Sequence, residues 1–196
     1  MTLAKNMYCE IKNALSKKQV NELISVGESS EFKQTTKEGE RNHIGSGRSP
    51  GTSLRVTINS NTIEWLKKRL QELAEKAVWK FLTEEGISID ISGGIEGKGL
   101  GTYSIYNEGD YYTWHKDANP RSRGRVARTR SLSIVIQLSE AKDYENGELL
   151  LKTHNKTITA SKELGDALIF TGDTLHSVAK ITKGTRKSLI FWFHKK

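Results

Sequence analysis

Apolar residues at helical spacing mark two segments in the N-terminal half of the chain. In the first segment, Ser16 stands three residues before Gln19, and apolar residues follow at helical intervals. This is the spacing of a capping box, in which each of the two side chains bonds the backbone N–H of the other residue. The pattern predicts a short helix from about Lys17 to Glu28.

The second segment predicts the longest helix of the chain. Asn61 and Glu64 repeat the capping-box spacing, and Gly86 provides a stop. Between them, apolar residues recur every three or four positions: Trp65, Leu66, Leu70, Leu73, Ala74, Ala77, Val78, Phe81 and Leu82. One face of this helix is therefore expected to pack on the rest of the protein, with Trp65 and Phe81 in the core.

Short segments with strand character dominate the remaining chain, and turn residues separate several of them. The predicted strands are 54–58, 102–107, 111–116, 131–138, 148–153, 156–160, 167–171, 176–181 and 186–193. No long helix is expected between the strands that follow Gly86, so an antiparallel sandwich or jelly roll is the simplest arrangement. The two helices would then cover one of its sheets.

Two of the predicted strands carry polar residues on one face and apolar residues on the other. Because successive side chains alternate, Ser133 and Gln137 share a face of one strand. Arg186 and Trp192 share a face of the last strand. We assign these polar faces to the barrel interior and the apolar faces to the side under the helices. The alternative, that the serine and glutamine meet water, is weakened by an arginine and a tryptophan on the matching face.

The composition is that of a globular chain. At 196 residues, with 35% hydrophobic and 28% charged residues, it predicts one domain with a substantial core. No run of about 18 apolar residues is present, and Met1 to Glu10 lack the pattern of a secretory signal, so no membrane span is expected. The single cysteine, Cys9, cannot form an internal disulfide, which favours a cytoplasmic setting.

The formal charge of +8 favours an anionic partner. Five arginines lie between Arg121 and Arg130 with no acidic residue among them. This segment is interpreted either as a solvated loop or as a lid that recruits an acidic peptide. A nucleic-acid partner is disfavoured, because no aromatic residues are interleaved for stacking.

His115 and Asp117 are the candidate beginning of a metal site. In a strand, side chains two residues apart share a face, and one more histidine would complete the two-histidine, one-carboxylate triad typical of non-haem Fe(II). Three histidines remain open as the third ligand: His154, His176 and His194. His176 is favoured, because it follows an apolar strand and a tight turn.

Arg186 follows His176 by ten residues. If Thr182 to Gly184 form a three-residue hairpin loop, His176 and Arg186 face the same side. Their backbones would then lie about 13 Å apart along the strands. The arginine fork would suit the far carboxylate of a small dicarboxylate bound between them.

These residues together resemble the iron(II) and 2-oxoglutarate-dependent oxygenases, specifically the prolyl 4-hydroxylase-like branch of PKHD-type hydroxylases. The resemblance covers about residues 95 to 193 in order. The matching positions are Tyr106, Gly109, Tyr112, His115, Asp117, Asp143 to Leu149, Gly165 to Phe170, His176, Gly184 to Arg186 and Trp192.

The resemblance implies an all-β core, a double-stranded β-helix of jelly-roll type, formed by 95–196 and supported by 1–94 within one structural domain. It implies Fe(II) bound by His115, Asp117 and His176, with Arg186 on the C5 carboxylate of 2-oxoglutarate. The remaining predicted cofactor contacts are Tyr106, Gln137, Ser133 and Trp192.

The implied activity is hydroxylation of an unactivated C–H bond with O2, releasing succinate and CO2, with ascorbate as a further candidate cofactor. The first candidate substrate is a peptidyl proline, followed by another protein side chain and then a free amino acid or small metabolite. A non-catalytic basic jelly-roll module and a cupin-like metalloenzyme remain alternatives.

Overall fold

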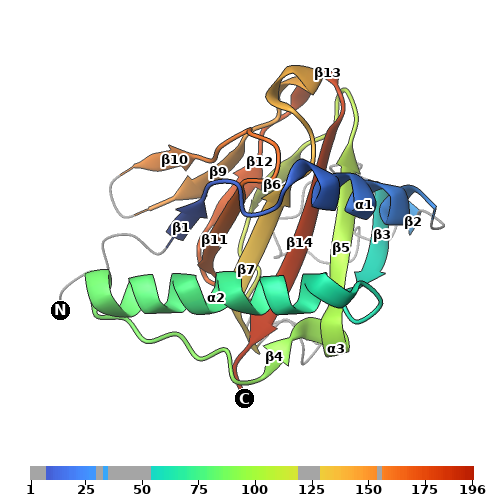
Figure 1. The fold of residues 1–196 in the computed structure, drawn as a ribbon. Coiled ribbons are helices and arrows are strands. Elements are labelled where there is room, and N and C mark those ends of the chain that lie inside the picture. Colours follow the sequence, from blue (N-terminus) through green and yellow to red (C-terminus); the bar gives the residue numbers. More distant parts are fainter. Residues whose placement is uncertain (1–7, 30–32, 35–53, 119–128, 154–155) are drawn as a thin grey trace, which may run out of the picture.

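An antiparallel sheet of eight strands forms the larger layer of the protein. The computed structural model describes residues 8–29, 33–34, 54–118, 129–153 and 156–196. The strands of this sheet are β1 (Tyr8–Ile11), β2 (Lys33–Gln34), β3 (Leu54–Asn59), β4 (Gly94–Ile95), β5 (Leu100–Tyr106), β7 (Arg130–Gln137), β11 (Ala167–Thr171) and β14 (Arg186–His194). They run in the order β1-β11-β7-β14-β5-β3-β2, and β4 pairs with β14 (Figure 1).

Two smaller antiparallel sheets complete the β structure. Their strands are β6 (Tyr112–His115), β8 (Tyr144–Asn146), β9 (Leu149–Lys152), β10 (Thr157–Thr159), β12 (His176–Val178) and β13 (Ile181–Gly184). Four of them form a sheet in the order β10-β9-β12-β6, and β13 and β8 form a separate two-stranded sheet among the described residues. This confirms the predicted all-β core, to which β1 and β3 from the N-terminal half contribute strands.

The helix α1 (Lys17–Glu28) has the predicted bounds and the predicted cap. Ser16 accepts a hydrogen bond from the backbone N–H of Gln19, and the Gln19 side chain accepts one from the backbone N–H of Ser16. Both ends of the capping box are therefore formed.

The helix α2 (Glu64–Glu85) ends as predicted but begins differently. Gly86 takes a left-handed conformation (φ 69°) and bonds back to the last turn, as expected of a glycine at this position. At the other end, the N-cap is Ile63, which makes no side-chain capping bond. The capping box predicted from Asn61 and Glu64 is wrong, because the helix begins at Glu64 itself.

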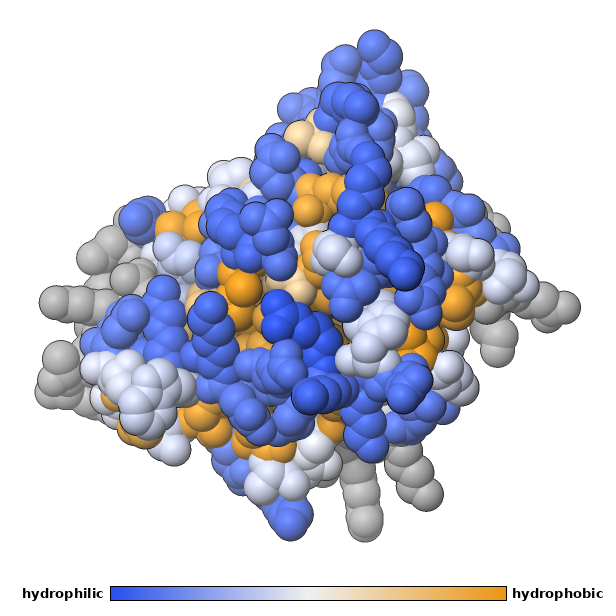
Figure 2. Space-filling view, viewed as in Figure 1, coloured by the Kyte–Doolittle hydropathy of each residue, from blue (hydrophilic) through white to orange (hydrophobic). Residues whose placement is uncertain are grey.

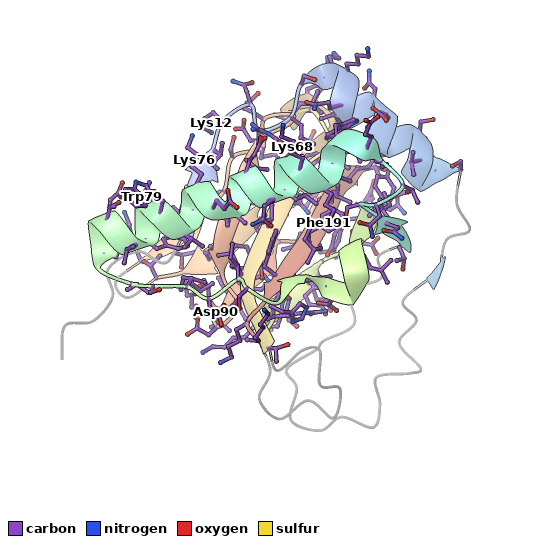
Figure 3. All side chains as sticks on the ribbon, turned by 60° about the horizontal axis from the view of Figure 1, so that its bottom comes forward. Lys12, Lys68, Lys76, Trp79, Asp90 and Phe191 are labelled. Atoms are coloured by element: carbon purple, nitrogen blue, oxygen red, sulfur yellow. The ribbon has the colours of Figure 1, made fainter. Side chains whose placement is uncertain are left out.

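The main core lies between the helices and the large sheet. Leu66, Leu70 and Leu73 of α2 are buried there, as is Phe191 of β14, which is labelled beneath the helix in Figure 3. The outer face of α2 carries polar residues such as Lys68, and hydrophilic side chains cover most of this side of the molecule (Figure 2). The apolar faces of β7 and β14 therefore pack under the helices, as predicted. Their buried members are Leu132, Ile134, Ile136, Leu189, Phe191 and Phe193.

The predicted hairpin between His176 and Arg186 is wrong. β12 ends at Val178 and pairs with β6 and β9, whereas β14 pairs with β5, β7 and β4. The chain crosses between the two sheets through β13, which pairs with β8. Gly184 is left-handed (φ 77°), as the hairpin required. Glycine is needed here for another reason: the backbone of Gly184 lies so close to Asp143 that an added Cβ would be 2.1 Å from the Asp143 carbonyl oxygen.

Short helical turns connect several strands. They are α3 (Glu96–Gly99) and the 3₁₀ turn η2 (Ala141–Asp143). Within the described ranges, no helix has the length and apolar character needed to cross a membrane. Most of the polar segment 29–53, and the arginines between 121 and 128, lie outside the described residues.

Candidate metal centre

Two neighbouring strands of the four-stranded sheet bring the predicted ligands together. His115 at the end of β6 pairs directly with His176 at the start of β12. Asp117 follows two residues after His115, and ligand atoms of all three residues lie within 4.8 Å of one another. His176 is therefore the histidine that joins the first two. His194 lies elsewhere, where its Nδ1 meets the Thr129 hydroxyl at 2.6 Å, and His154 is outside the described residues.

Backbone carbonyls orient both imidazole rings. The Nδ1 of His115 lies 2.8 Å from the carbonyl oxygen of Thr113, and that of His176 lies 2.9 Å from the carbonyl oxygen of Thr174. Because a carbonyl oxygen only accepts, each Nδ1 carries a hydrogen, and Nε2 is the ring nitrogen directed at the site. The two Nε2 atoms lie 3.8 Å and 3.6 Å from the carboxylate oxygens of Asp117. Two imidazole nitrogens and a carboxylate thus converge on one point.

Asp117 is buried and held as a carboxylate. Burial alone would raise its pKa, but the two imidazoles and the Ser133 hydroxyl outweigh burial, so the pKa lies below its ordinary value. Ser133 donates to the carboxylate at 2.7 Å. The buried indole nitrogen of Trp192 also helps to lower this pKa, although it completes no well-formed hydrogen bond within the described part of the chain.

A cavity of about 410 Å³ extends from the three ligands into the space between the sheets. It is lined by Thr57, Glu96, Leu100, Gly101, Thr102, Tyr106, Tyr112, His115, Lys116, Asp117, Arg130, Val135, Leu149, His176, Val178, Arg186, Ser188, Ile190 and Trp192. The predicted polar face of β14 contributes Arg186, Ser188 and Trp192 to it, whereas the predicted polar face of β7 contributes Val135. His176 and Arg186 do line one cavity, but from different sheets.

Arg186 lies in this cavity without an acidic partner. It is 3% exposed, its Nη1 lies 3.4 Å from the Ser188 hydroxyl, and its guanidinium lies 5.7 Å from the centre of the Tyr106 ring. No acidic residue in the described ranges forms an ion pair with it. A buried charge is costly unless it is paired, so we expect this arginine to bind an anion in the cavity.

The other predicted cofactor contacts divide into two pairs. Tyr106 and Trp192 line the cavity. Ser133 and Gln137 do not, because their polar atoms are directed at protein groups: Ser133 bonds Asp117, and the Gln137 amide donates to the Tyr144 hydroxyl at 2.9 Å. Ser133 and Gln137 therefore support residues that face the site, and their role as cofactor contacts stays a prediction.

Two residues near the site, Glu96 and Tyr144, had no predicted role, and a third, Arg130, was predicted only as part of the solvated or substrate-recruiting arginine segment. Arg130 forms two hydrogen bonds to Glu96, the longer being 2.7 Å, and its guanidinium lies 3.8 Å from the centre of the Trp192 ring. Arg130 stood at the end of an arginine-rich run, and only the fold shows that it is paired. Tyr144 lay within the matching pattern but carried no chemical signal of its own.

The chain resembles known proteins in sequence and in fold. Residues 101–194 match the model of the 2OG-Fe(II) oxygenase superfamily. A PKHD-type hydroxylase of Acinetobacter baumannii is 28% identical over 193 residues, which cover 95% of this chain and 77% of that protein. The matched segment contains His115, Asp117, His176 and Arg186. By these similarities the chain is an enzyme of the 2-oxoglutarate-dependent dioxygenase class, whose members use Fe(II), 2-oxoglutarate and O2.

Solved structures of prolyl hydroxylases share the fold. A prolyl 4-hydroxylase of Pseudomonas putida superposes with a TM-score of 0.67 at 17% identity, covering 97% of this chain and 93% of that one. A prolyl hydroxylase of Trichoplax adhaerens, in complex with a peptide fragment of hypoxia inducible factor, gives 0.67 at 18% identity, covering 97% and 84%. The predicted jelly-roll core is confirmed.

Proposed function

We propose that this oxygenase hydroxylates a side chain of a peptide or protein, with a peptidyl proline as the first candidate. The observation that carries the proposal is the single cavity that joins His115, Asp117 and His176 to the buried Arg186. The first three fit a divalent metal, and the fourth fits a carboxylate.

The donor set suits Fe(II). Two neutral imidazoles and one carboxylate form the triad that leaves further coordination positions open on non-haem iron, and His115, Asp117 and His176 would be its ligands. When bound, the iron together with 2-oxoglutarate and O2 supplies the oxidising power to hydroxylate a C–H bond, with succinate and CO2 released.

At the metal, the protein itself holds the three ligand side chains in the orientation that binding requires. The Thr113 and Thr174 carbonyls fix both rings with Nε2 directed at the site, so the nitrogen that would bind the metal is already in place. The Ser133 hydroxyl orients the Asp117 carboxylate in the same way.

The task of Arg186 is to bind the far carboxylate of 2-oxoglutarate. Its fork of donors matches a carboxylate, and its burial excludes the water that would otherwise compete. The Tyr106 ring lies beside the Arg186 guanidinium, whereas we assign the Trp192 indole N–H, which lies near Asp117, as a further donor at the metal end of the cavity.

The substrate is expected at the open side of the cavity, and we propose that it is acidic. Of the charged residues in the lining, Glu96 is paired with Arg130, whereas Lys116 is exposed and forms no ion pair within the described ranges. Once the metal and the cosubstrate occupy the other charged groups of the lining, Lys116 is the charged side chain that can bind a substrate. The peptide in the Trichoplax adhaerens complex supports a peptide as its class.

The proposal is tested by measuring succinate formation in enzyme loaded anaerobically with Fe(II) and then supplied with 2-oxoglutarate, O2 and peptide mixtures. Mass spectrometry of the peptides should show a gain of one oxygen, and His176→Ala should abolish both signals. Parallel reactions with free amino acids test the small-molecule alternative, and reactions with and without ascorbate test that predicted cofactor. Failure to form succinate under every condition would favour the non-catalytic binding module.

A further inference from the structure

Tyr144 reaches the site from a separate part of the fold. It belongs to β8, whose one strand partner in the described part of the chain is β13, and Figure 1 shows β13 at one extremity of the molecule, beyond the start of β14. The Tyr144 side chain nevertheless lies inside the protein, 4% exposed, and its hydroxyl meets Gln137 of β7 and Arg186 of β14. One residue of the small β8–β13 sheet thus touches the predicted anion-binding arginine.

The chemistry of these contacts fixes the role of the phenol. The Gln137 amide donates to its oxygen at 2.9 Å. A guanidinium has only donors, so the contact with Arg186 also uses the phenol oxygen as acceptor. Burial raises the pKa of Tyr144, and the positive charge of Arg186 opposes this shift without reversing it. The phenol is therefore neutral, so it can orient the Arg186 guanidinium without neutralising its positive charge.

Tyr144 is itself held from both sides. The ammonium group of Lys162 lies 4.1 Å from the centre of its ring and donates to its backbone carbonyl at 3.3 Å. On the other side, the Gln137 amide that meets the hydroxyl also bonds the carbonyl oxygen of Ser139 at 3.3 Å. The Tyr144 hydroxyl is thus held in place, and it can restrict the conformation of the long, flexible Arg186 side chain.

We propose that Tyr144 is a positioning residue that sets how far the Arg186 guanidinium reaches into the cavity, and thereby the length of diacid that the site accepts. The inference rests on the proposed role of Arg186 in binding 2-oxoglutarate. Without the hydroxyl, Arg186 would retract or tilt toward Gln137. A five-carbon diacid would lose contact, and a six-carbon diacid would lose less.

The chain offers a matched control in Tyr103. It is as deeply buried as Tyr144 but belongs to the main core, on the helix-covered side of the large sheet, where its ring lies against Gly27 of α1. Tyr103→Phe removes the same atom from an equally buried tyrosine away from Arg186.

The experiment measures binding rather than turnover. Mn(II)-loaded protein is titrated without O2 by calorimetry, once with 2-oxoglutarate and once with 2-oxoadipate, its homologue one carbon longer. Tyr144→Phe should weaken 2-oxoglutarate binding about tenfold, in line with a lost hydrogen bond to a charged group. It should also reduce the preference for 2-oxoglutarate over 2-oxoadipate, whereas Tyr103→Phe should behave as wild type.

The outcomes separate the two proposals. If wild type binds neither diacid, the proposed function fails first. If wild type binds but Tyr144→Phe leaves both constants unchanged, or weakens both by the same factor, the positioning role is overturned. Gln137→Met, which removes the amide donor but keeps the phenol, provides a second variant that should shift the preference in the same direction. An unchanged preference in that variant also contradicts the inference.

Discussion

His176 and His115 lie directly opposite each other in the register between β12 and β6, with ring centroids 4.1 Å apart. The metal centre therefore depends on a strand pairing between residues 61 positions apart in the chain. Because a slip of one residue would turn a side chain to the other face of the sheet, this pairing must be held firmly. The carbonyls of Thr113 and Thr174, each two residues before a histidine, then fix the orientation of the two rings.

Ser133→Ala should weaken metal binding. The hydroxyl donates to Asp117 at 2.7 Å, and loss of such a partner to a ligand lowers metal affinity about 10- to 100-fold. Titration with Mn(II), followed by electron paramagnetic resonance, measures the effect. Ser131→Ala is the matched control, because this serine lies two residues away on the same strand and bonds the Phe193 carbonyl instead. Equal affinity in the two variants would contradict the role of Ser133.

Arg186→Gln should raise the KM for 2-oxoglutarate about 10- to 100-fold, which is the expected loss of charged hydrogen bonds to one carboxylate. The kcat at saturating 2-oxoglutarate should fall much less, since the arginine binds the far end of the cosubstrate. Lys187→Gln is the control, because Lys187 is paired with Glu28 and does not line the cavity. A fall in kcat with an unchanged KM would show that Arg186 has another role.

Asp166 should make the stability of the fold depend on pH. Burial tends to raise its pKa, but hydrogen bonds from Ser161 and the backbone of Asn13, together with Lys12, outweigh burial and lower it. Because the folded protein then releases this proton more readily than the unfolded chain, the contribution is full above about pH 4, the ordinary carboxyl pKa. It is lost as the pH falls through the lowered pKa.

Asp166→Asn should therefore lower the free energy of unfolding at pH 7 by about 1–3 kcal/mol. The difference from wild type should shrink as the pH falls below about 4. Urea unfolding at a series of pH values measures it, and Glu163→Gln, an exposed acid three residues away, is the control. A difference that stays constant down to the lowest accessible pH would refute this account of Asp166.

Leu70→Ala should lower the free energy of unfolding by about 2–5 kcal/mol, because it opens a cavity between α2 and the large sheet. Lys68→Ala, on the outer face of the same helix (Figure 3), should change it by less than about 0.5 kcal/mol. Chemical denaturation compares the two variants. Similar losses in both would mean that α2 is not docked through this face.

The features predicted correctly from the sequence are those with local causes. The α1 cap follows from two side chains three residues apart. His115 and Asp117 do converge, although β6 ends at His115 and Asp117 stands just beyond the strand. The start of α2 was predicted wrongly because spacing alone cannot show which residue leaves the helix, and Ile63 provides no side-chain cap to recognise.

The features that sequence reasoning missed depend on which sheet a strand joins. The turn residues before Arg186 fit a hairpin equally well, but the pairing of β12 with β6 and of β14 with β5 and β7 is decided by packing across the whole fold. The meeting of Tyr144 with Arg186 has the same origin, because it exists only once β8 lies beside the end of β14.

The central claim, that His115, Asp117 and His176 hold one ferrous ion in the cavity that Arg186 closes, is tested most directly by crystallography. Crystals grown anaerobically with Fe(II) and 2-oxoglutarate should show an anomalous iron peak about 2.0–2.2 Å from the two Nε2 atoms and one Asp117 oxygen. A carboxylate should lie within hydrogen-bond distance of the Arg186 guanidinium. Iron bound elsewhere, or 2-oxoglutarate bound without contact to Arg186, would contradict the account.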